Sequence, residues 1–219
     1  MPLPEPGFIL LIDQTRGDGA VRASGGGQID FDAMLAHAKA HFPDHKIIIR
    51  THPETQLGYR AGHFSAEALD DDMELLTHAI APQDLFAAAR AVYTVTSQMG
   101  FEAIWAGHRP VVFGQPFYAG WGLTRDVHPI HRRGRSLTAA QLFAGAVMLY
   151  PKWYDPCRDT LCSLEHVLDQ LEAETRAWRD DHAGWEARGI SLWKRQPLQK
   201  FFGRHRPLRF QSKPGSHRP

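Results

Sequence analysis

The stretch FILLID, residues 8–13, determines how the rest of the chain is interpreted. Its residues are apolar without interruption until Asp13, so they lack the alternation of a strand that faces water on one side. A short continuous apolar run is typical of a strand buried on both faces of a parallel sheet. Asp13 is therefore expected at the carboxyl end of such a strand.

Strand-like and helix-like segments alternate along the chain after this first strand. Further strands are expected at 46–53, 91–97 and 110–114. Helices are expected at 29–42, 82–91, 97–107 and 136–150, the first with Asp30 and the last with Ser136 as N-cap. Residues 54–82 are polar and irregular, and no element is expected there. This alternation predicts an α/β fold with a Rossmann-like parallel sheet covered on both faces.

Beyond residue 150 the composition changes. Residues 163–181 have the pattern of an amphipathic helix with Ser163 as N-cap. No acidic residue follows Glu186, whereas basic residues continue, and Pro197 is expected to prevent a long helix. The expected organisation is a Rossmann-like domain, a helical extension and a basic linker-like tail, at residues 1–150, 151–187 and 188–219.

Composition excludes several classes of protein. The formal net charge of +1 gives no field that would attract nucleic acid. No apolar run approaches the roughly 20 residues that span a bilayer, and the N-terminus lacks the features of a secretory signal, so a cytoplasmic location is expected. The pairs His37 with His41 and His128 with His131 have no acidic ligand at a fixed spacing, so no metal site is expected at either pair.

Polar residues follow the first two expected strands. Asp13 and Asp18 are two carboxylates that would serve as nucleophile, base or metal ligands, although a turn built from Asp and Gly is the alternative interpretation. His52 ends the second strand and Pro53 stops it, which aims an imidazole that would donate to a phosphate or a base. The alternative is a strand-end histidine without a ligand.

A third polar group follows the strand expected at 91–97. Thr96 and Ser97 begin a helix, and hydroxyls with free amide groups at a helix start favour an anion site. Gly100 would permit close approach, and Glu102 would suit the paired hydroxyls of a ribose. Ordinary N-capping by Ser97 is the alternative.

The fourth feature is the glycine-rich aromatic stretch VVFGQPFYAGWGLTRD, residues 111–126. It combines large rings with flexible backbone directly after a buried strand, and an aromatic patch that packs a long loop is the bland interpretation. Because ligands of open parallel sheets bind outside the carboxyl ends of the strands, all four features are expected in one crevice.

Four segments in this order carry a resemblance to a known family: ILLIDQTRGD, RTHPE, TSQMGFEAIWAG and FGQPFYAGWGLT. From about residue 8 to about residue 200 the chain resembles the capsule polysaccharide biosynthesis family of the KpsC/LipB type. Those proteins are β-Kdo glycosyltransferases that build an oligo-Kdo linker on phosphatidylglycerol. The resemblance implies a GT-B-like architecture of two Rossmann-like halves, of which this sequence contains the donor-binding half.

The resemblance also implies CMP-Kdo as the donor, with no cofactor, and a retaining mechanism. His52 and Pro53 would contact the CMP moiety, and Thr96 and Ser97 would receive its phosphate. Glu102 matches the glutamate of the GFEA motif, and its placement suggests a ribose contact.

Retention by double displacement needs a carboxylate close to the anomeric carbon. Asp13 and Asp18 are both candidates for that nucleophile, and Asp13 is preferred because it lies at the end of the strand.

The aromatic stretch would then enclose the donor. Gly120 and Gly122 would let the loop close, while Tyr118 and Trp121 would offer flat faces to the sugar or the cytosine. The candidates for pairing with the Kdo carboxylate are Arg16 and Arg125.

The acceptor implied by the resemblance is a lipid-linked oligo-Kdo glycan, bound by another half or a second module outside this sequence. A non-catalytic CMP-binding remnant or partner subunit is one alternative, and another nucleotide-sugar enzyme of the same fold is the second. The tail is expected to be a linker whose apolar residues pack on the donor domain. Its aromatic residues beside Lys and Arg leave a peripheral contact with the inner membrane as the alternative.

Overall fold

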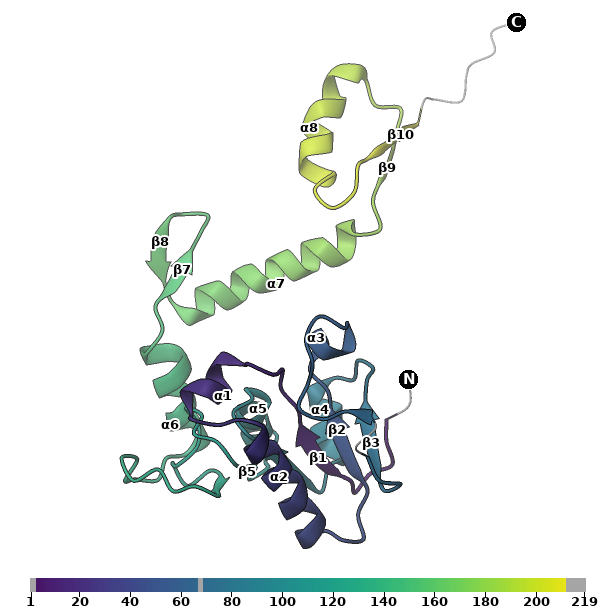
Figure 1. Cartoon of the computed structure of the whole chain (residues 1–219). Helices are drawn as coiled ribbons and strands as arrows, with labels where there is room; N and C mark the ends of the chain where they lie inside the picture. Colours follow the sequence, from purple (N-terminus) through teal and green to yellow (C-terminus); the bar gives the residue numbers. More distant parts are fainter. Residues whose placement is uncertain (1–2, 67–68, 212–219) are drawn as a thin grey trace, which may run out of the picture. The chain divides into compact units, whose positions relative to one another are not determined.

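The computed structural model describes residues 3–66 and 69–211 and divides the chain into two compact units, Met1–Ala146 and Val147–Pro219 (Figure 1). The expected domain boundary at residue 150 lies close to this division. Each unit is described here by itself.

The first unit is built on a six-stranded parallel sheet in the order β3-β2-β1-β4-β5-β6. Its strands are β1 Ile9–Ile12, β2 Ile47–Arg50, β3 Met73–Leu76, β4 Ala91–Thr94, β5 Val111–Val112 and β6 Arg125–Asp126. This order confirms the Rossmann-like α/β fold and places the topological switch point between β1 and β4.

Helices cover both faces of this sheet, which explains the continuous apolar run of the first strand. Leu11 belongs to the core cluster beneath α2 (Gln28–His41). Leu10 points the other way and shares a second cluster with residues of α4 (Pro82–Ala88) and α5 (Met99–Trp105) (Figure 1). Because successive side chains of β1 enter different cores, no position of the strand tolerates a polar residue.

The prediction that residues 54–82 lack regular structure is wrong. β3 lies there, at the edge of the sheet, together with the one-turn helix α3 (Pro53–Gln56). Only Met73 and Leu76 of β3 are buried, while Glu74 pairs with Lys46 at the surface. The strand escaped prediction because an edge strand needs few apolar residues.

Two predicted helix caps are also wrong. Asp30 lies within the first turn of α2 and accepts a hydrogen bond from the N–H of Gly27 at 2.7 Å. Thr138, not Ser136, caps α6 and accepts from the N–H of Gln141 at 3.2 Å. α6 lies at Ala139–Phe143, and the π-helical segment Ala144–Leu149 that follows it contains the division between the two units.

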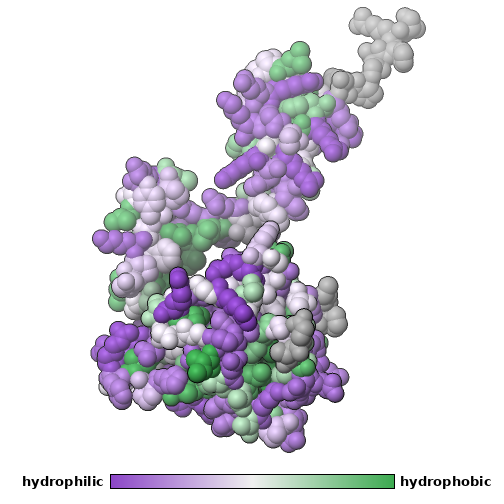
Figure 2. All heavy atoms as spheres, viewed as in Figure 1, coloured by the Kyte–Doolittle hydropathy of each residue, from purple (hydrophilic) through white to green (hydrophobic). Residues whose placement is uncertain are grey.

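The second unit begins with a hairpin and a long helix: β7 Trp153–Asp155, β8 Thr160–Cys162 and α7 Leu164–Asp181. Ser163 caps α7 as predicted, and His166 contacts Asp155 at 2.8 Å, which fastens the helix to the hairpin. Hydrogen bonds from Gln170 and His166 hold the pKa of Asp155 well below its usual range. A hydrophobic patch along α7 is visible in Figure 2, where Leu168 and Leu171 are exposed.

The tail is not the linker that the sequence predicts, at least as far as residue 211. β9 Glu186–Arg188, α8 Leu192–Phe202 and β10 Arg209–Gln211 form a β–α–β unit with parallel strands (Figure 1). Pro197 lies inside α8, whose inner face packs through Phe202 against Trp185 and through Arg195 over the ring of Phe210. These contacts offset the hydrogen bond that proline removes.

The rest of the predicted tail, residues 212–219, lies outside the described part of the chain. Among the helices of the described ranges, none is long and apolar enough to cross a membrane.

Candidate functional site at the sheet switch point

The ends of β1 and β4 are joined by a pair of buried polar side chains. The Nε2 of Gln14 donates to the hydroxyl of Thr96 at 3.0 Å, and the N–H of Thr96 donates to the Oε1 of Gln14 at 2.9 Å. Each is the second residue after its strand, on the two sides of the switch point. The backbone at the place where ligands of this fold bind is therefore fixed by side chains.

Asp13 is part of this framework and is only 2% exposed. Its carboxylate accepts hydrogen bonds from the N–H groups of Gln14 at 2.8 Å and His63 at 3.1 Å. Burial raises the pKa of Asp13 to about 6, although these hydrogen bonds act in the opposite direction. A Cβ on Gly62 would lie 2.2 Å from its Oδ2, so Asp13 has no free approach from that side. Asp13 thus lies at the end of β1 as predicted from the strand, and its carboxylate fastens the neighbouring loop through the N–H of His63.

The loop after β1 lies against residues 60–64, a segment that the sequence did not single out. Thr15 forms a β-bridge with Gly62, and the N–H of Arg16 donates to the carbonyl of Ala61 at 2.8 Å. The Nε of Arg16 donates to the carbonyl of Gly62 at 3.0 Å. One of the three guanidinium nitrogens of Arg16 is therefore already hydrogen-bonded within the protein. The segment has no hydrophobic period or motif spacing, so the sequence offers no signal for it.

Asp18 begins the short helix α1 (Gly19–Ala23) as its N-cap. Its Oδ1 accepts hydrogen bonds from the N–H groups of Ala20 at 2.7 Å and Val21 at 3.2 Å. The carboxylate is therefore oriented by the backbone and, unlike that of Asp13, stays partly exposed.

His52 caps α3 at the carboxyl end of β2. Its Nδ1 accepts a hydrogen bond from the N–H of Glu54 at 3.2 Å, so the ring proton is placed on Nε2. Pro53 is the first residue of α3, where its missing N–H costs nothing. This arrangement gives a fixed imidazole N–H donor beside the end of β1.

Ser97 and Gly100 lie at the start of α5, next to a buried ring. The hydroxyl of Tyr118 donates to the carbonyl of Ser97 at 2.5 Å, and Tyr118 is fully buried. A Cβ on Gly100 would lie 2.2 Å from the Tyr118 oxygen. Gly100 therefore makes room for Tyr118 rather than for a ligand, and Tyr118 cannot offer its face to a sugar as predicted. Burial raises the pKa of Tyr118 above its usual range.

The loop after β5 is fastened at several points. Gly120 and Gly122 adopt φ values of +75° and +81°, which explains why glycine occupies both positions. The N–H of Gly120 donates to Asp126 at 2.9 Å. Arg133 lies 5.4 Å from the ring of Trp121 and donates to the carbonyls of Pro116 and Ala119. These bonds hold the loop in place and give the two glycines a reason other than the predicted loop closure.

The last two predicted residues, Glu102 and Arg125, lie apart from each other in the first unit. Glu102, in the first turn of α5, is near Arg50 at the end of β2, since its charge partly offsets the lowering of the Arg50 pKa by burial. Arg125 pairs with Val111 on the edge strand β6, three strands from β1, and is not brought to the cluster around Asp13.

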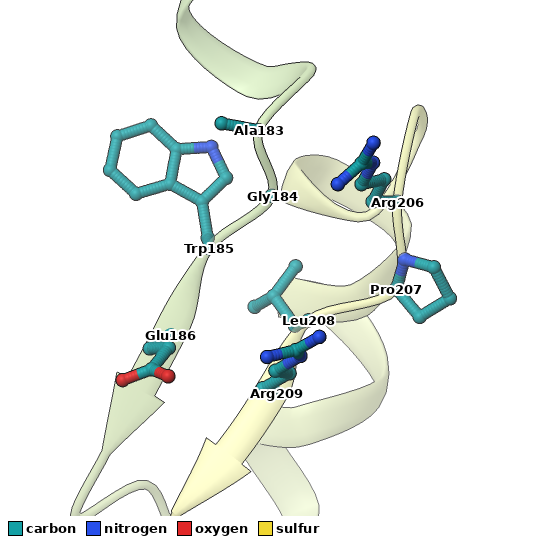
Figure 3. Close-up of a pocket in the computed structure, with 8 residues that line it drawn as sticks. All are labelled: Ala183, Gly184, Trp185, Glu186, Arg206, Pro207, Leu208 and Arg209. Carbon is teal, nitrogen blue, oxygen red and sulfur yellow. The ribbon is translucent and has the colours of Figure 1, made fainter.

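A cavity of about 250 Å³ opens beside the end of β4. It is lined by Ala20, Ala23, Ser24, Thr96, Gln115, Pro116, Phe117 and Arg132. A larger cavity of about 560 Å³ lies in the second unit, between residues 183–186 and 206–209 (Figure 3). Only the first cavity contains a residue that the sequence predicted for the site, Thr96. The described ranges contain no group of three or more His, Cys, Asp or Glu side chains placed to hold a metal ion.

Known proteins resemble the chain over most of its length. The family described as capsule polysaccharide biosynthesis protein matches residues 4–151. The capsule polysaccharide modification protein LipA of Neisseria meningitidis serogroup B is 36% identical over 206 residues, which are 90% of this chain and 29% of LipA. The lipopolysaccharide-processing protein LpsZ of Rhizobium meliloti is 29% identical over 166 residues, which are 76% of this chain and 38% of LpsZ. The chain thus spans well under half the length of these relatives.

Two solved structures share the fold. The β-Kdo 2,4 transferase of Thermosulfurimonas dismutans KpsC superposes with a TM-score of 0.72 at 37% identity, over 77% of this chain and 53% of that one. The β-Kdo 2,7 transferase of the same KpsC gives a TM-score of 0.62 at 26% identity, over 80% of this chain and 55% of that one. The match of the family over residues 4–151, together with these likenesses, shows that the chain belongs to the capsule polysaccharide biosynthesis protein family.

Proposed function

We propose that the first unit binds the nucleotide-sugar donor of a glycosyltransferase of capsule polysaccharide biosynthesis, and that the donor is CMP-Kdo. The observation that carries the proposal is the set of oriented polar groups at the switch point of a sheet that superposes on β-Kdo transferases. The lipid-linked glycan acceptor would be bound by another half or a second module, outside this chain.

The cluster has dimensions that suit a nucleotide. His52 follows β2 and Ser97 follows β4, and β1 lies between these strands. Strands lie about 4.8 Å apart, so the ends of β2 and β4 are separated by about 10 Å across the sheet. A cytidine would lie near the His52 N–H and Glu102, with its phosphate toward Ser97.

Asp18 is the proposed nucleophile. Its carboxylate would attack the anomeric carbon of Kdo and form a glycosyl ester while CMP leaves with the bonding electrons. A deprotonated acceptor hydroxyl would then displace the carboxylate, which restores Asp18 and retains the configuration. Asp13 is less suited to this role than Asp18, because its carboxyl group is buried and accepts hydrogen bonds from backbone N–H groups.

The substitution Asp18→Asn separates catalysis from folding, because asparagine is as good an N-cap as aspartate. We expect the isolated chain to turn over slowly or not at all with CMP-Kdo and a Kdo-primed lipid, and an added acceptor-binding half to restore transfer. In the restored system Asp18→Asn should abolish transfer and leave CMP affinity nearly intact. Full transfer by this variant would show that the nucleophile lies elsewhere.

Calorimetry with nucleotides tests donor binding itself. CMP should bind distinctly more tightly than UMP or ADP. His52→Ala should weaken CMP by roughly 1–3 kcal/mol, the range for losing a hydrogen bond to a charged or polar ligand group. Equal affinity for all three nucleotides would rule out a cytidine-selective site.

A second proposal, that α8 contacts an anionic membrane surface, rests on a different observation. Trp193, Pro197 and Phe201 are spaced four residues apart and are all exposed, with Lys194 and Lys200 beside them. The inner face of α8 is occupied by contacts with the rest of its β–α–β unit, so this apolar stripe points outward. Apolar and basic side chains on one helix face suit the headgroup region of a bilayer.

A further inference from the structure

The cavity beside the end of β4 is lined mostly by residues that the sequence did not predict for the site. Its apolar surface comes from α1 and from the loop after β5, through Ala20, Ala23, Pro116 and Phe117. Its polar surface includes the side chain of Arg132, which comes from a later segment of the chain. The cavity therefore combines flat apolar walls with one permanent positive charge.

Arg132 differs from its neighbour in the chain. Arg133 is used by the protein itself, since it donates to two carbonyls of the loop and lies over Trp121. Arg132 is exposed and belongs to none of the seven ion pairs formed within the residues that the structure describes. The carboxylate of Asp126, whose charge acts on Arg133, accepts hydrogen bonds from the N–H of Gly120 at 2.9 Å and from the hydroxyl of Thr124 at 2.7 Å.

Two adjacent guanidinium groups create a local excess of positive charge. The pKa of Arg133 is lowered first by burial and then by the charge of Arg132. An oxyanion beside Arg132 would relieve this repulsion and would match the planar geometry of the guanidinium.

The size of the cavity limits what it can hold. Pockets for complete small ligands have volumes of about 300–1,000 Å³, and about 250 Å³ suits one part of such a ligand. The cavity is adjacent to Thr96 and to the helix that Asp18 caps. That position corresponds to the sugar end of the donor or to its junction with the phosphate.

We propose that Arg132 binds an oxyanion of the donor in this cavity, and that, where this oxyanion is the sugar carboxylate, Arg132 makes the site selective for donors with an acidic sugar. The inference rests on the proposed function, since it assumes that a CMP-activated donor occupies the switch point. It takes the place of Arg125, which lies on the edge strand β6, and of Arg16, whose Nε already donates to the carbonyl of Gly62. The oxyanion is either the sugar carboxylate or the nucleotide phosphate, which present the same chemistry to a guanidinium.

The test compares Arg132→Gln with Arg135→Gln in the full chain. Arg135 is exposed, three residues away, and outside the cavity lining, so its substitution makes the same change in net charge. Affinities for cytidine, CMP and freshly prepared CMP-Kdo are measured by calorimetry, with thermal unfolding to verify that both variants are folded.

Arg132→Gln should weaken CMP-Kdo about 10- to 100-fold, the range for a lost charged hydrogen bond, while Arg135→Gln changes it less than twofold. If CMP keeps its affinity, the oxyanion is the sugar carboxylate, and if CMP weakens equally while cytidine does not, it is the phosphate. Equal affinities of the two variants for all ligands overturn the inference alone. If the unsubstituted chain binds neither CMP nor CMP-Kdo, the proposed function fails and the inference fails with it.

Discussion

Gln14 and Thr96 are separated by 82 residues in the sequence and joined by two hydrogen bonds across the switch point of the sheet. This pair fixes the end of β1 relative to the end of β4 before any ligand arrives. The site is therefore organised by the protein's own polar contacts, which has consequences that can be measured.

Replacing Gln14 by alanine should loosen this junction. The substitution removes both hydrogen bonds and leaves the buried N–H of Thr96 without its partner. The free energy of unfolding in urea should fall by about 2–3 kcal/mol, and CMP affinity should fall with it. Gln196→Ala, on the exposed surface of α8, is the matched control and should change neither quantity. A Gln14→Ala variant as stable as the control would show that the pair contributes nothing.

Gly100→Ala should disturb the packing of Tyr118. The new methyl group would lie 2.2 Å from the tyrosine oxygen and 2.8 Å from Cγ2 of Thr94. We expect a loss of about 1–3 kcal/mol in unfolding free energy, because the surroundings are closely packed. Tyr118→Phe in the same chain removes one of the clashing atoms, so a double-mutant cycle should show a favourable coupling. Strictly additive effects would contradict the contact.

The stability of the chain should depend on pH through Asp13. Its pKa in the folded state is about 6, raised from 3.8, so folding favours the protonated carboxyl. This preference contributes about 3 kcal/mol to the free energy of unfolding. The contribution is fully present below about pH 4 and is lost as pH rises through about 6. Asp13→Asn should abolish this part of the pH dependence in urea unfolding between pH 4 and pH 7.

His63 acts in the opposite direction, because burial lowers its pKa. The unsubstituted chain and the Asp13→Asn variant both keep His63. The difference between their pH profiles of unfolding free energy therefore reports on Asp13. Identical pH profiles for the unsubstituted chain and Asp13→Asn would show that the carboxyl titrates normally.

The stripe on α8 predicts binding to vesicles. The full chain should co-sediment with phosphatidylglycerol vesicles at low salt, and added salt should weaken binding because it screens exposed charges. A variant with Trp193→Ser and Phe201→Ser should bind at least tenfold more weakly. Tyr150→Ser, at a residue that is 88% exposed elsewhere in the same unit, is the control. If the unsubstituted chain stays in the supernatant, the membrane contact is wrong.

The part of the fold that was predictable from the sequence is the part with both faces buried. The run at 8–13 contributes side chains to two cores, so its pattern has one interpretation. The edge strand β3 buries only its ends, and the β–α–β unit of the tail is held by contacts such as Phe202 with Trp185. Neither leaves a periodic signal, and proline inside α8 argued against the structure that forms.

For the site residues, position could be predicted from the sequence but the surroundings of each side chain could not. Residues that follow strands closely, such as His52 and Ser97, lie at the carboxyl edge of the sheet because chain direction fixes that position. The roles of Asp13, Gly100 and Tyr118 depend on which side chains fill the space around them, and spacing in the sequence carries no information about that. Arg132 was not predicted, because it lies in the loop between β6 and α6, where no strand or helix pattern fixes its position.

A crystal structure of the full chain with CMP tests the central claim most directly. The account predicts CMP at the carboxyl ends of β2, β1 and β4, with the cytidine beside the Nε2 of His52 and the phosphate within about 3 Å of the Ser97 hydroxyl or the Arg132 guanidinium. Density for CMP in the cavity between residues 183–186 and 206–209, or none at the switch point at a saturating concentration, would contradict it.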